Sequence, residues 1–309
     1  MSIESTEVPW SKLAKQIIAS RIDNEIAKSE RFQTGLSHFV VSVETSGGSE
    51  YVIRIATPER KSELVDGLLW HKRLDDLGVP LPTIYDSGEI DGFHFALYER
   101  LPGDDLENVY SSLGANSKKE IAASVAWIQE RVAALDKEYF NQYPAWPDVI
   151  TGILDRSEEA IKAADDTVQK YFDTAHEMTT RYMSYLTAVE PLAFLYDLNI
   201  RNVIILDGRM SGVIDVDEIW FGDPLLAVGR GKALLLAMQQ ETDYIDYWCD
   251  YLKLSAETLL MVDLYALLYC VRFMATSRQK LNGNYNIQTD PENMAILKTA
   301  ADGIIGKLS

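Results

Sequence analysis

The sequence is poor in cysteine, and its first residues are not typical of a leader. It has two cysteines, Cys249 and Cys270, both in apolar surroundings, and it begins Met-Ser-Ile-Glu-Ser-Thr-Glu without a basic, apolar start. So few thiols exclude a disulfide framework and a cysteine-rich zinc site, and the start is not typical of a signal peptide. Charged residues interrupt even the apolar residues 225–238, so no membrane span is expected. We therefore expect a soluble, cytoplasmic protein.

Positive charge is also scarce. The 309 residues include 29 Lys and Arg against 47 Asp and Glu, which gives a formal net charge of −18. This charge argues against nucleic acid or an anionic membrane as a partner, because both would be repelled. It would attract a cationic small molecule, although solubility alone also explains it. Apolar residues at 47% and charged residues at 25% are ordinary for a globular protein.

The first hundred residues predict a small antiparallel sheet with a helix packed on it. Alternating apolar residues flank Gly47-Gly48, which is typical of a hairpin, and Thr57-Pro58 is a helix start that Gly78 and Pro80 end. The predicted elements are a helix over 9–28, strands over 39–43 and 51–56, a helix over 59–77, and strands over 83–87 and 93–99.

Beyond a short linker at Leu101-Pro102-Gly103, the periodicity is mostly helical. Helices are expected over 118–135, much of 149–188, 224–238, 243–252, 256–280 and 291–305. The chain therefore predicts an α+β fold with two lobes, a sheet lobe over 1–101 and a helical lobe over 102–309. Ligands commonly bind in the cleft between such lobes.

One stretch in the helical lobe brings oxygen-bearing side chains together. Asp197 is followed five residues later by Asn202, and Asp215 lies thirteen residues after that. Between Asn202 and Asp215, two apolar runs flank Asp207-Gly208, a strong signal for a two-residue hairpin. The hairpin would return Asp215 to the side of Asp197 and Asn202. Three such groups suit a hard cation, and one carboxylate can act as a base.

These residues stand in three motifs, which are Tyr196-Asp-Leu-Asn-Ile-Arg-Asn-Val203, Gly212-Val-Ile-Asp-Val-Asp-Glu218 and Gly222-Asp-Pro224. Together with the order of elements, they resemble the aminoglycoside/macrolide phosphotransferase and choline kinase family. The resemblance covers nearly the whole chain. It implies a protein-kinase-like fold, with a small antiparallel sheet as the first lobe and a mostly helical second lobe. It also implies a phosphotransferase that uses ATP or GTP with Mg²⁺.

The resemblance also implies roles for the central residues. Asp197 would be the catalytic aspartate that accepts or orients the acceptor hydroxyl, while Asn202 and Asp215 would hold Mg²⁺ on the nucleotide phosphates. Arg201 would contact the transferring phosphoryl group, or else pair with a local acid. The family usually has His-Gly before the catalytic Asp, where this chain has Leu195-Tyr196.

The sheet lobe would supply the nucleotide contacts. Arg54 takes the position of the family's phosphate-binding lysine, with Val52 over the base on the same face of the strand. A cross-strand salt bridge of Arg54 with Glu44 is the alternative. The acid expected to pair with Arg54 from the following helix is Glu63, although Asp66 fits the spacing equally well.

Two further segments would complete the nucleotide site. The phosphate loop, which has a single glycine, would bind through Thr34, Gly35, Ser37 and backbone N–H groups. His38 is a further candidate donor, or a packed residue at the start of a strand. The backbone of Glu99 and Leu101 would contact the edge of the base. Asp223-Pro224 is expected to cap the next helix, and Ala227 stands where the family often has an Asp.

The acceptor side is less defined by the sequence. Asp217 and Glu218 follow the metal ligand Asp215 and would bind a cationic acceptor, although solvated acids are equally consistent with the sequence. Residues 147–190 are rich in acids and carry aromatic side chains, which would suit an amine through charge and cation–π contact. A solvated outer helix face explains the same acids.

The predicted function is therefore a small-molecule kinase that transfers the γ-phosphate of ATP or GTP to a hydroxyl of a cationic or amine-containing acceptor. The expected partners are a nucleotide and this acceptor, with neither nucleic acid nor membrane. The alternatives are a nucleotide-binding pseudokinase and a helical interaction module. Aminoglycoside, macrolide, choline, sugar and amino-acid kinases share the motifs, so an antibiotic-resistance enzyme and a metabolic kinase both remain open.

Overall fold

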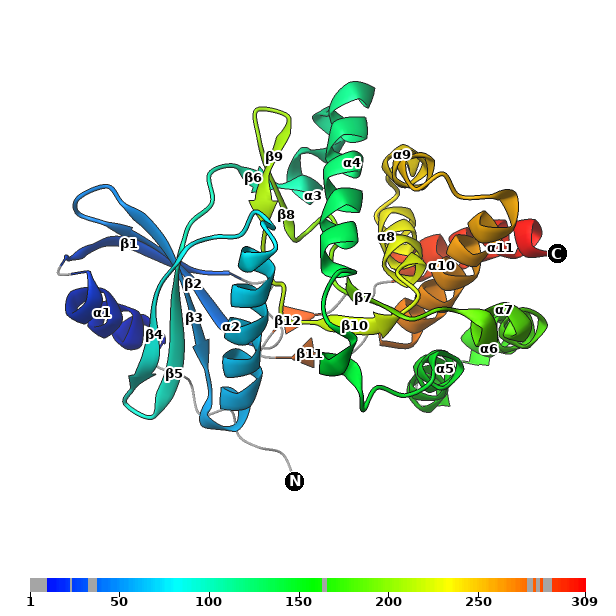
Figure 1. Ribbon diagram of the computed structural model, residues 1–309, viewed down its shortest axis with the longest axis horizontal. Helices are drawn as coiled ribbons and strands as arrows, with labels where there is room; N and C mark the ends of the chain where they lie inside the picture. Colours follow the sequence, from blue (N-terminus) through cyan, green and yellow to red (C-terminus); the bar gives the residue numbers. More distant parts are fainter. Residues whose placement is uncertain are drawn as a thin grey trace.

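The computed structural model describes residues 10–22, 24–32, 38–162, 166–276, 280–281, 284–285 and 291–309. It has the predicted α+β architecture of an antiparallel sheet lobe followed by a helical lobe (Figure 1). The predicted phosphate-loop residues Thr34, Gly35 and Ser37 lie outside the described residues.

The first lobe is a five-stranded antiparallel sheet in the order β1-β2-β3-β5-β4. Helix α1 packs on one face, where Ile17 and Ile18 meet Val41 and Ile53. Helix α2 packs on the other face and lies between the sheet and the helical lobe in Figure 1. The elements are α1 (Trp10–Arg21), β1 (Ile26–Arg31), β2 (Phe39–Thr45), β3 (Glu50–Ala56), a 3-10 turn (Pro58–Arg60), α2 (Lys61–Asp76), β4 (Ile84–Ile90) and β5 (Phe93–Glu99).

The first strand corrects the sequence prediction. The helix predicted over 9–28 ends at Arg21, and residues 26–31 form the edge strand β1. Ile-Ala-Lys-Ser-Glu-Arg has no regular apolar alternation, so no strand pattern is visible in it. The strand forms because it pairs along β2, with Ser29 opposite Val43. Pairing with a distant segment thus overrides a weak local pattern.

The two lobes join where backbone packs against backbone. After β5, Gly103 has φ 116°, and a Cβ there would lie 2.2 Å from the Ile205 carbonyl oxygen. This approach lets β6 (Asp104–Asp105) pair with β8 (Val203–Leu206), which continues into β9 (Arg209–Val213). The β8–β9 turn is the predicted one, with Asp207 at φ 51° and Gly208 at φ 75°. The predicted domain limits of 1–101 and 102–309 remain a prediction.

The second lobe is built around α10, which packs against α8, α11, α5 and α6. Helix α10 corrects the expectation that no segment could cross a membrane, because it is long and apolar enough to do so. However, 78% of its most apolar window is buried inside the protein, as in a core helix. The helices are α3 (Leu106–Val109), α4 (Ala115–Val132), α5 (Trp146–Lys162), α6 (Asp166–Arg181), α7 (Met183–Ala188), α8 (Leu225–Ala237), α9 (Asp243–Tyr251), α10 (Ala256–Thr276) and α11 (Pro291–Leu308), with 3-10 turns at Tyr110–Ser112 and Lys137–Phe140.

A strand pair absent from the sequence prediction frames the central stretch. β7 (Leu192–Leu195) pairs antiparallel with β10 (Ile219–Gly222), so Leu195 lies opposite Ile219. Gly222 is required here, because a Cβ would lie 1.9 Å from the Trp146 ring. A separate two-stranded pair, β11 (Lys280–Leu281) and β12 (Asn284–Tyr285), follows α10 in the chain. Residues 196–218 are therefore held at both ends by one short ladder.

Candidate active site

The β8–β9 hairpin brings Asp197, Asn202 and Asp215 together as the sequence predicts. Asn202 Nδ2 donates to the Asp197 carbonyl oxygen at 2.8 Å, and the Ile214 N–H donates to the Asn202 carbonyl oxygen at 2.9 Å. The first bond turns Asn202 Oδ1 away from Asp197 and leaves this oxygen as an acceptor or metal ligand. Asp215 adopts φ 56°, a left-handed conformation that Asp tolerates better than most residues.

The loop before Asp197 is braced by a residue that the sequence did not reveal. Gln129 of α4 accepts from the Leu195 N–H at 2.9 Å and donates to the Leu195 carbonyl oxygen at 2.9 Å. Gln129 is 6% exposed, so these are buried bonds that fix the main chain. The amide thus braces the loop at the point where the family's histidine is missing. A polar residue on the apolar face of the predicted helix 118–135 was the available signal.

A second unpredicted residue, Arg230 of α8, pairs with the predicted base. Its guanidinium donates to Asp197 Oδ1, and Asn199 Nδ2 donates to the same oxygen. Burial opposes the charge of Arg230, yet the Asp197 carboxylate beside it raises the arginine's pKa. The described side-chain bonds of this carboxylate go to Oδ1, so Oδ2 has no described donor.

An aromatic group supports this pair. Arg230 lies 4.9 Å from the Tyr196 ring centroid, and Tyr196 stacks on Trp220 with centroids 4.0 Å apart. The Tyr269 hydroxyl donates to the Tyr196 hydroxyl at 2.8 Å. Tyr196, which replaces the family's glycine, is therefore built into the core of the helical lobe.

Arg201 is held by an acid from the neighbouring helix. Its Nε donates to Glu107 Oε2 at 2.8 Å, and its Nη2 donates to Glu107 Oε1 at 3.2 Å. The Glu107 N–H also donates to the Ile200 carbonyl oxygen at 2.9 Å. In this structure Arg201 therefore follows the alternative interpretation, an ion pair with a local acid.

Arg54 of the sheet lobe pairs with acids of the helical lobe. Its two terminal nitrogens donate to Asp217 at 3.1 and 2.5 Å, and one of them lies 3.3 Å from Asp215. His38 Nδ1 is 3.0 Å from the same guanidinium. A guanidinium can only donate, so His38 Nδ1 accepts and the proton of the neutral ring is on Nε2. Burial, followed by the charge of Arg54, lowers the pKa of His38 to about 4.

The predicted partners of Arg54 on the first lobe are wrong. Glu63 is exposed and pairs with Arg60 at 3.1 Å, and Asp66 is also exposed. Both point away because the buried face of α2 carries Leu64, Gly67, His71 and Leu74 instead. Glu44 does not pair with Arg54 either, since it lies opposite Glu50 while Arg54 lies opposite Val40.

Asp215 and the acids that follow it lie close enough to Asp197 to influence one another's charge. Burial raises the pKa of Asp215 to about 6, with Asp217 and Asp197 adding to the rise and Arg54 opposing it. Water still reaches the Asp215 side chain, which is 51% exposed. Burial and then the charge of Asp197 raise the pKa of Glu218 to about 7, although its side chain also reaches solvent. A carboxylate cluster of this kind gains by binding a cation.

These donors fit Mg²⁺ bound together with nucleotide phosphates. Asn202 Oδ1 and the exposed Asp215 carboxylate are both oxygen ligands, which Mg²⁺ requires. Within the described residues, no group of three or more His, Cys, Asp or Glu side chains could hold a metal by itself. A partial protein ligand set is typical of Mg²⁺ that is completed by phosphate and water.

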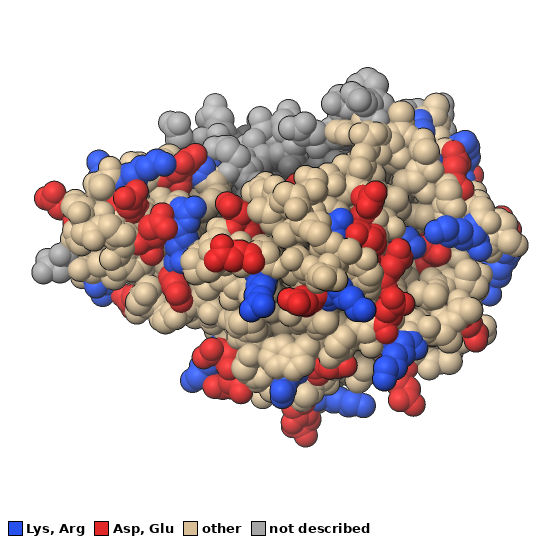
Figure 2. All heavy atoms as spheres, turned by 90° about the horizontal axis from the view of Figure 1, so that it is seen from above, with Lys and Arg blue, Asp and Glu red and all other residues tan. Residues whose placement is uncertain are grey.

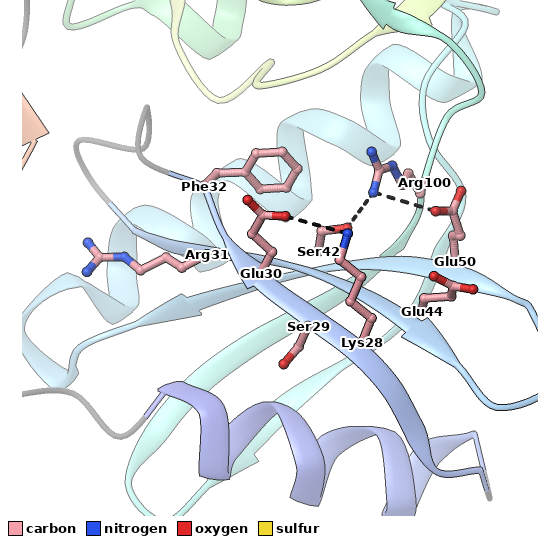
Figure 3. A pocket seen from close by; sticks show the side chains of 9 residues that line it. All are labelled: Lys28, Ser29, Glu30, Arg31, Phe32, Ser42, Glu44, Glu50 and Arg100. Carbon is pink, nitrogen blue, oxygen red and sulfur yellow. Dashed lines mark hydrogen bonds and ion pairs between the residues drawn. The ribbon is translucent and has the colours of Figure 1, made fainter.

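The face of the sheet that bears Arg54 also carries a pocket of about 260 Å³ (Figure 3). Arg100, just after β5, lines this pocket. Its Nη1 donates to Ser42 Oγ at 2.5 Å and lies 3.6 Å from Glu50 Oε1. Val52 faces the same side and packs with Ala96 and Tyr98. The lining residues are Lys28, Ser29, Glu30, Arg31, Phe32, Ser42, Glu44, Glu50 and Arg100.

The hinge residues lie at the junction of the lobes. Glu99 ends β5, and its side chain accepts from the Thr83 N–H at 3.1 Å and hydroxyl at 2.9 Å. Leu101 packs close to Gly212 of β9, where a Cβ would approach the leucine side chain to 2.8 Å. Leu101 therefore contacts the β8–β9 hairpin of the helical lobe, while the Glu99 side chain stays with Thr83 of the sheet lobe.

The described side chains of the acidic, aromatic helices do not form the predicted wall for a cationic acceptor. Tyr171 and Phe172 are buried in the core, and Tyr185 donates to Asp223 Oδ2 at 3.0 Å. Acids such as Asp173 and Glu177 are exposed on the outer face.

Asp223 Oδ1 also accepts from the Leu225 N–H at 3.0 Å, which is the predicted cap. One face of the molecule shows acidic and basic side chains interspersed (Figure 2).

The sheet lobe, the helical lobe and this cluster of acids define a kinase-like phosphotransferase architecture. A model of the phosphotransferase enzyme family matches residues 28–250, more than half of the chain, and the chain belongs to this family. It is 24% identical over 220 residues to hygromycin-B 4-O-kinase of Escherichia coli. That match spans 65% of this chain and 61% of the relative's length.

Solved aminoglycoside phosphotransferases have the same fold. A thermostable mutant of APH(4)-Ia in a ternary complex with AMP-PNP and hygromycin B matches with a TM-score of 0.68 at 19% identity, covering 95% of this chain and 98% of that one. The GDP complex of wild-type aminoglycoside 2'-phosphotransferase-IIIa matches with a TM-score of 0.70 at 16% identity, covering 97% and 99%.

Proposed function

We propose that the protein is a small-molecule kinase that transfers the γ-phosphate of ATP or GTP to an acceptor hydroxyl. The observation that carries the proposal is the convergence of Asp197, Asn202 and Asp215 with Arg54 of the other lobe. Asn202 is tied to Asp197 at 2.8 Å, and Asp215 lies 3.3 Å from Arg54. Phosphoryl transfer depends on positioning and charge neutralisation, which this set of groups can supply.

Each residue has a specific role in this proposal. Asn202 Oδ1 and Asp215 would hold Mg²⁺, which when bound neutralises phosphate charge. Asp197 Oδ2 accepts the acceptor hydroxyl's proton or orients it, while Arg230 and Asn199 hold Oδ1. Arg54 binds phosphate, and Arg201 stays with Glu107 as a support of the loop.

The nucleotide lies along the face of the sheet that bears Arg54. We place the base against Val52 and the backbone of Glu99 and Leu101, with the pocket beside Arg100 at its outer end. Thr34, Gly35 and Ser37 remain predicted phosphate contacts. The similar structures hold AMP-PNP in one case and GDP in another, so adenine and guanine nucleotides are both candidates.

The acceptor is proposed to be an amine-bearing polyhydroxy compound. The Glu218 carboxyl is close enough to Asp197 for the charge of Asp197 to act on it. It also lies two residues before Trp220, whose ring stacks on Tyr196. Glu218 can therefore bind an ammonium group beside the reacting hydroxyl. Asp217 is occupied by Arg54 and is therefore a weaker candidate for the acceptor. Hygromycin B, the substrate named for the curated relative, is the first compound to test.

The test is transfer of labelled γ-phosphate from ATP and GTP to a panel of aminoglycosides, choline, sugars and amino acids, with hygromycin B included. Asp197→Ala should abolish transfer to the identified acceptor while Mg²⁺–nucleotide binding persists. Asp207→Asn, at the exposed turn of the same hairpin, is the matched control and should transfer normally. Full activity of Asp197→Ala on a verified acceptor would exclude the role of this residue.

The pseudokinase alternative depended on Leu195, on Arg54 and on the phosphate loop with its single glycine, which lies outside the described residues. Gln129 braces Leu195, and Asp217 pairs with Arg54, so the first two departures have compensating contacts. These contacts support transfer over simple nucleotide binding. Nucleotide binding without transfer to any acceptor, and without slow hydrolysis, would favour the pseudokinase. Absence of Mg²⁺-dependent nucleotide binding would favour an interaction module.

A further inference from the structure

We propose that Asp217 is the positioning residue for Arg54, in place of the helix acid expected from α2. The inference rests on the proposed function, because it assumes that Arg54 binds nucleotide phosphate. Asp217 follows the metal-binding candidate Asp215 by two residues. It would therefore fix the cation of the sheet lobe from within the metal-binding segment of the helical lobe.

The contact between Asp217 and Arg54 is bidentate and partly buried. The two terminal nitrogens of Arg54 donate to the two Asp217 oxygens at 3.1 and 2.5 Å. The side chains are 13% and 20% exposed. A fork-to-fork arrangement restricts the guanidinium more than a single bond does, and low exposure limits competition by water. Arg54 is thereby held at the cleft with one edge still facing Asp215.

Gly67 of α2 gives an independent indication that this site is built for Asp217. A Cβ at Gly67 would lie 2.7 Å from both Cγ and Oδ1 of Asp217. Glycine inside a helix is unfavourable by about 1 kcal/mol relative to alanine, so a packing reason is expected for it. The buried face of α2 offers no acid to Arg54, because it carries Leu64, Gly67, His71 and Leu74.

The arrangement has a consequence for how the two lobes act together. An acid on α2 would let the sheet lobe hold its own arginine. With Asp217 as partner, Arg54 takes its binding position only when residues 215–217 lie against α2. Phosphate binding by Arg54 and metal binding by Asp215 would therefore depend on the same segment.

The experiment measures the dissociation constant of Mg²⁺–AMP-PNP and Mg²⁺–GDP by calorimetry for Asp217→Asn. We expect affinity to fall about 10-fold, since the neutral amide can satisfy only part of the guanidinium fork. Glu63→Gln and Asp66→Asn, which remove the acids of α2, should bind within about twofold of the wild type. Asp217→Asn binding as tightly as the wild type, or more tightly, would overturn the inference, because Asp217 would then only occupy Arg54 in the empty site.

Gly67→Ala tests the same contact from the helix side. The added methyl group displaces Asp217, so we expect weaker nucleotide binding together with an unchanged or higher melting temperature. Val65→Ala, on the exposed face of α2, is the control and should bind normally. The double variant Gly67→Ala/Asp217→Asn should bind no worse than Asp217→Asn alone. Additive losses, or wild-type binding by Gly67→Ala, would overturn the inference. A wild type that binds neither nucleotide would instead exclude the proposed function.

Discussion

The proposed catalytic segment of the helical lobe, residues 195–215, and the side of the sheet proposed to bind the nucleotide are held in different ways. Leu195 and Tyr196 are buried and tied to Gln129 and Tyr269, which belong to the core helices α4 and α10. On the sheet, Arg100 contacts Ser42 and Glu50 at the surface of an open pocket (Figure 3). One region is part of the core, while the other is a charged surface.

This difference separates the expected effects of mutation. A substitution beneath the catalytic segment removes buried bonds, so it should lower stability and turnover together. A substitution on the sheet surface removes exposed ion pairs, which contribute little to stability, so it should act on nucleotide affinity alone. Four variants test this separation.

Gln129→Leu should have the largest effect. It leaves the N–H and the carbonyl of Leu195 buried without their partners, each of which costs about 1–3 kcal/mol. We expect the free energy of unfolding to fall by about 3 kcal/mol, measured by urea denaturation, with a parallel loss of transfer. Gln169→Leu is the control, since Gln169 donates to exposed Asp173 rather than to a buried main-chain group. A loss below about 1 kcal/mol would mean that Gln129 is not the brace.

Arg230→Met should lower turnover far more than nucleotide affinity. Without the guanidinium, Asp197 Oδ1 keeps only Asn199 as a described donor, and the base is less well oriented. We expect kcat on the identified acceptor to fall about 10- to 100-fold, while the Kd of Mg²⁺–nucleotide stays within about twofold.

Two further variants control this prediction. Arg209→Met removes an exposed arginine from β9 and should have normal turnover. Arg230→Lys should recover part of the activity, because it restores the charge without the planar fork. Equal losses in kcat and nucleotide affinity for Arg230→Met would indicate a general structural role instead.

The sequence predicts contacts within one local segment better than contacts between distant segments. The spacing of Asp197, Asn202 and Asp215 spans a single hairpin, whose turn requires the positive φ found at Asp207 and Gly208. Local spacing therefore predicts that these three residues come together. The partners that hold it come from far along the chain, such as Gln129, which lies 66 residues before Leu195. Nothing local indicates which distant side chain will fill that place.

The surroundings of Arg54 in the sheet lobe show more clearly what local spacing cannot predict. Arg54 and Asp217 are 163 residues apart, and the sequence favoured Glu63, which is much nearer. A helix acid at the right spacing was a reasonable candidate, but the direction of each side chain depends on how α2 packs on the sheet. Gly67 was the visible signal, because a glycine within an amphipathic helix marks a close contact.

Asp105→Asn tests strand β6, which follows the sheet lobe and pairs with β8 of the proposed catalytic hairpin. Its effect on stability should depend on pH. Burial, followed by the charges of Glu107 and Asp104, raises the pKa of Asp105 to about 6 from a usual value of 3.8. A raised carboxyl pKa means that the ionised group destabilises the fold above about pH 6, and that this cost disappears below about pH 4.

We therefore expect Asp105→Asn to raise the free energy of unfolding by about 1–2 kcal/mol at pH 8 and by little at pH 4. Denaturation curves at the two pH values measure this difference. Asp104→Asn, at the exposed neighbouring position, should give a smaller gain. A gain that is the same at both pH values would not come from the ionisation of Asp105.

Arg100→Ala should have the smallest effect on stability, and it is the variant most specific to the sheet. The ion pair with Glu50 is 3.6 Å long and exposed, so the free energy of unfolding should change by less than about 0.5 kcal/mol. If the base lies beside this pocket, the ratio of the Kd values for Mg²⁺–AMP-PNP and Mg²⁺–GDP should shift about two- to threefold, because a guanidinium donates to the acceptor atoms of guanine more favourably than to adenine. Lys28→Ala, which removes another cation of the pocket, should leave the ratio unchanged. A large loss of stability in Arg100→Ala would contradict the division between the two regions, since this surface would then be as tightly integrated as the catalytic segment.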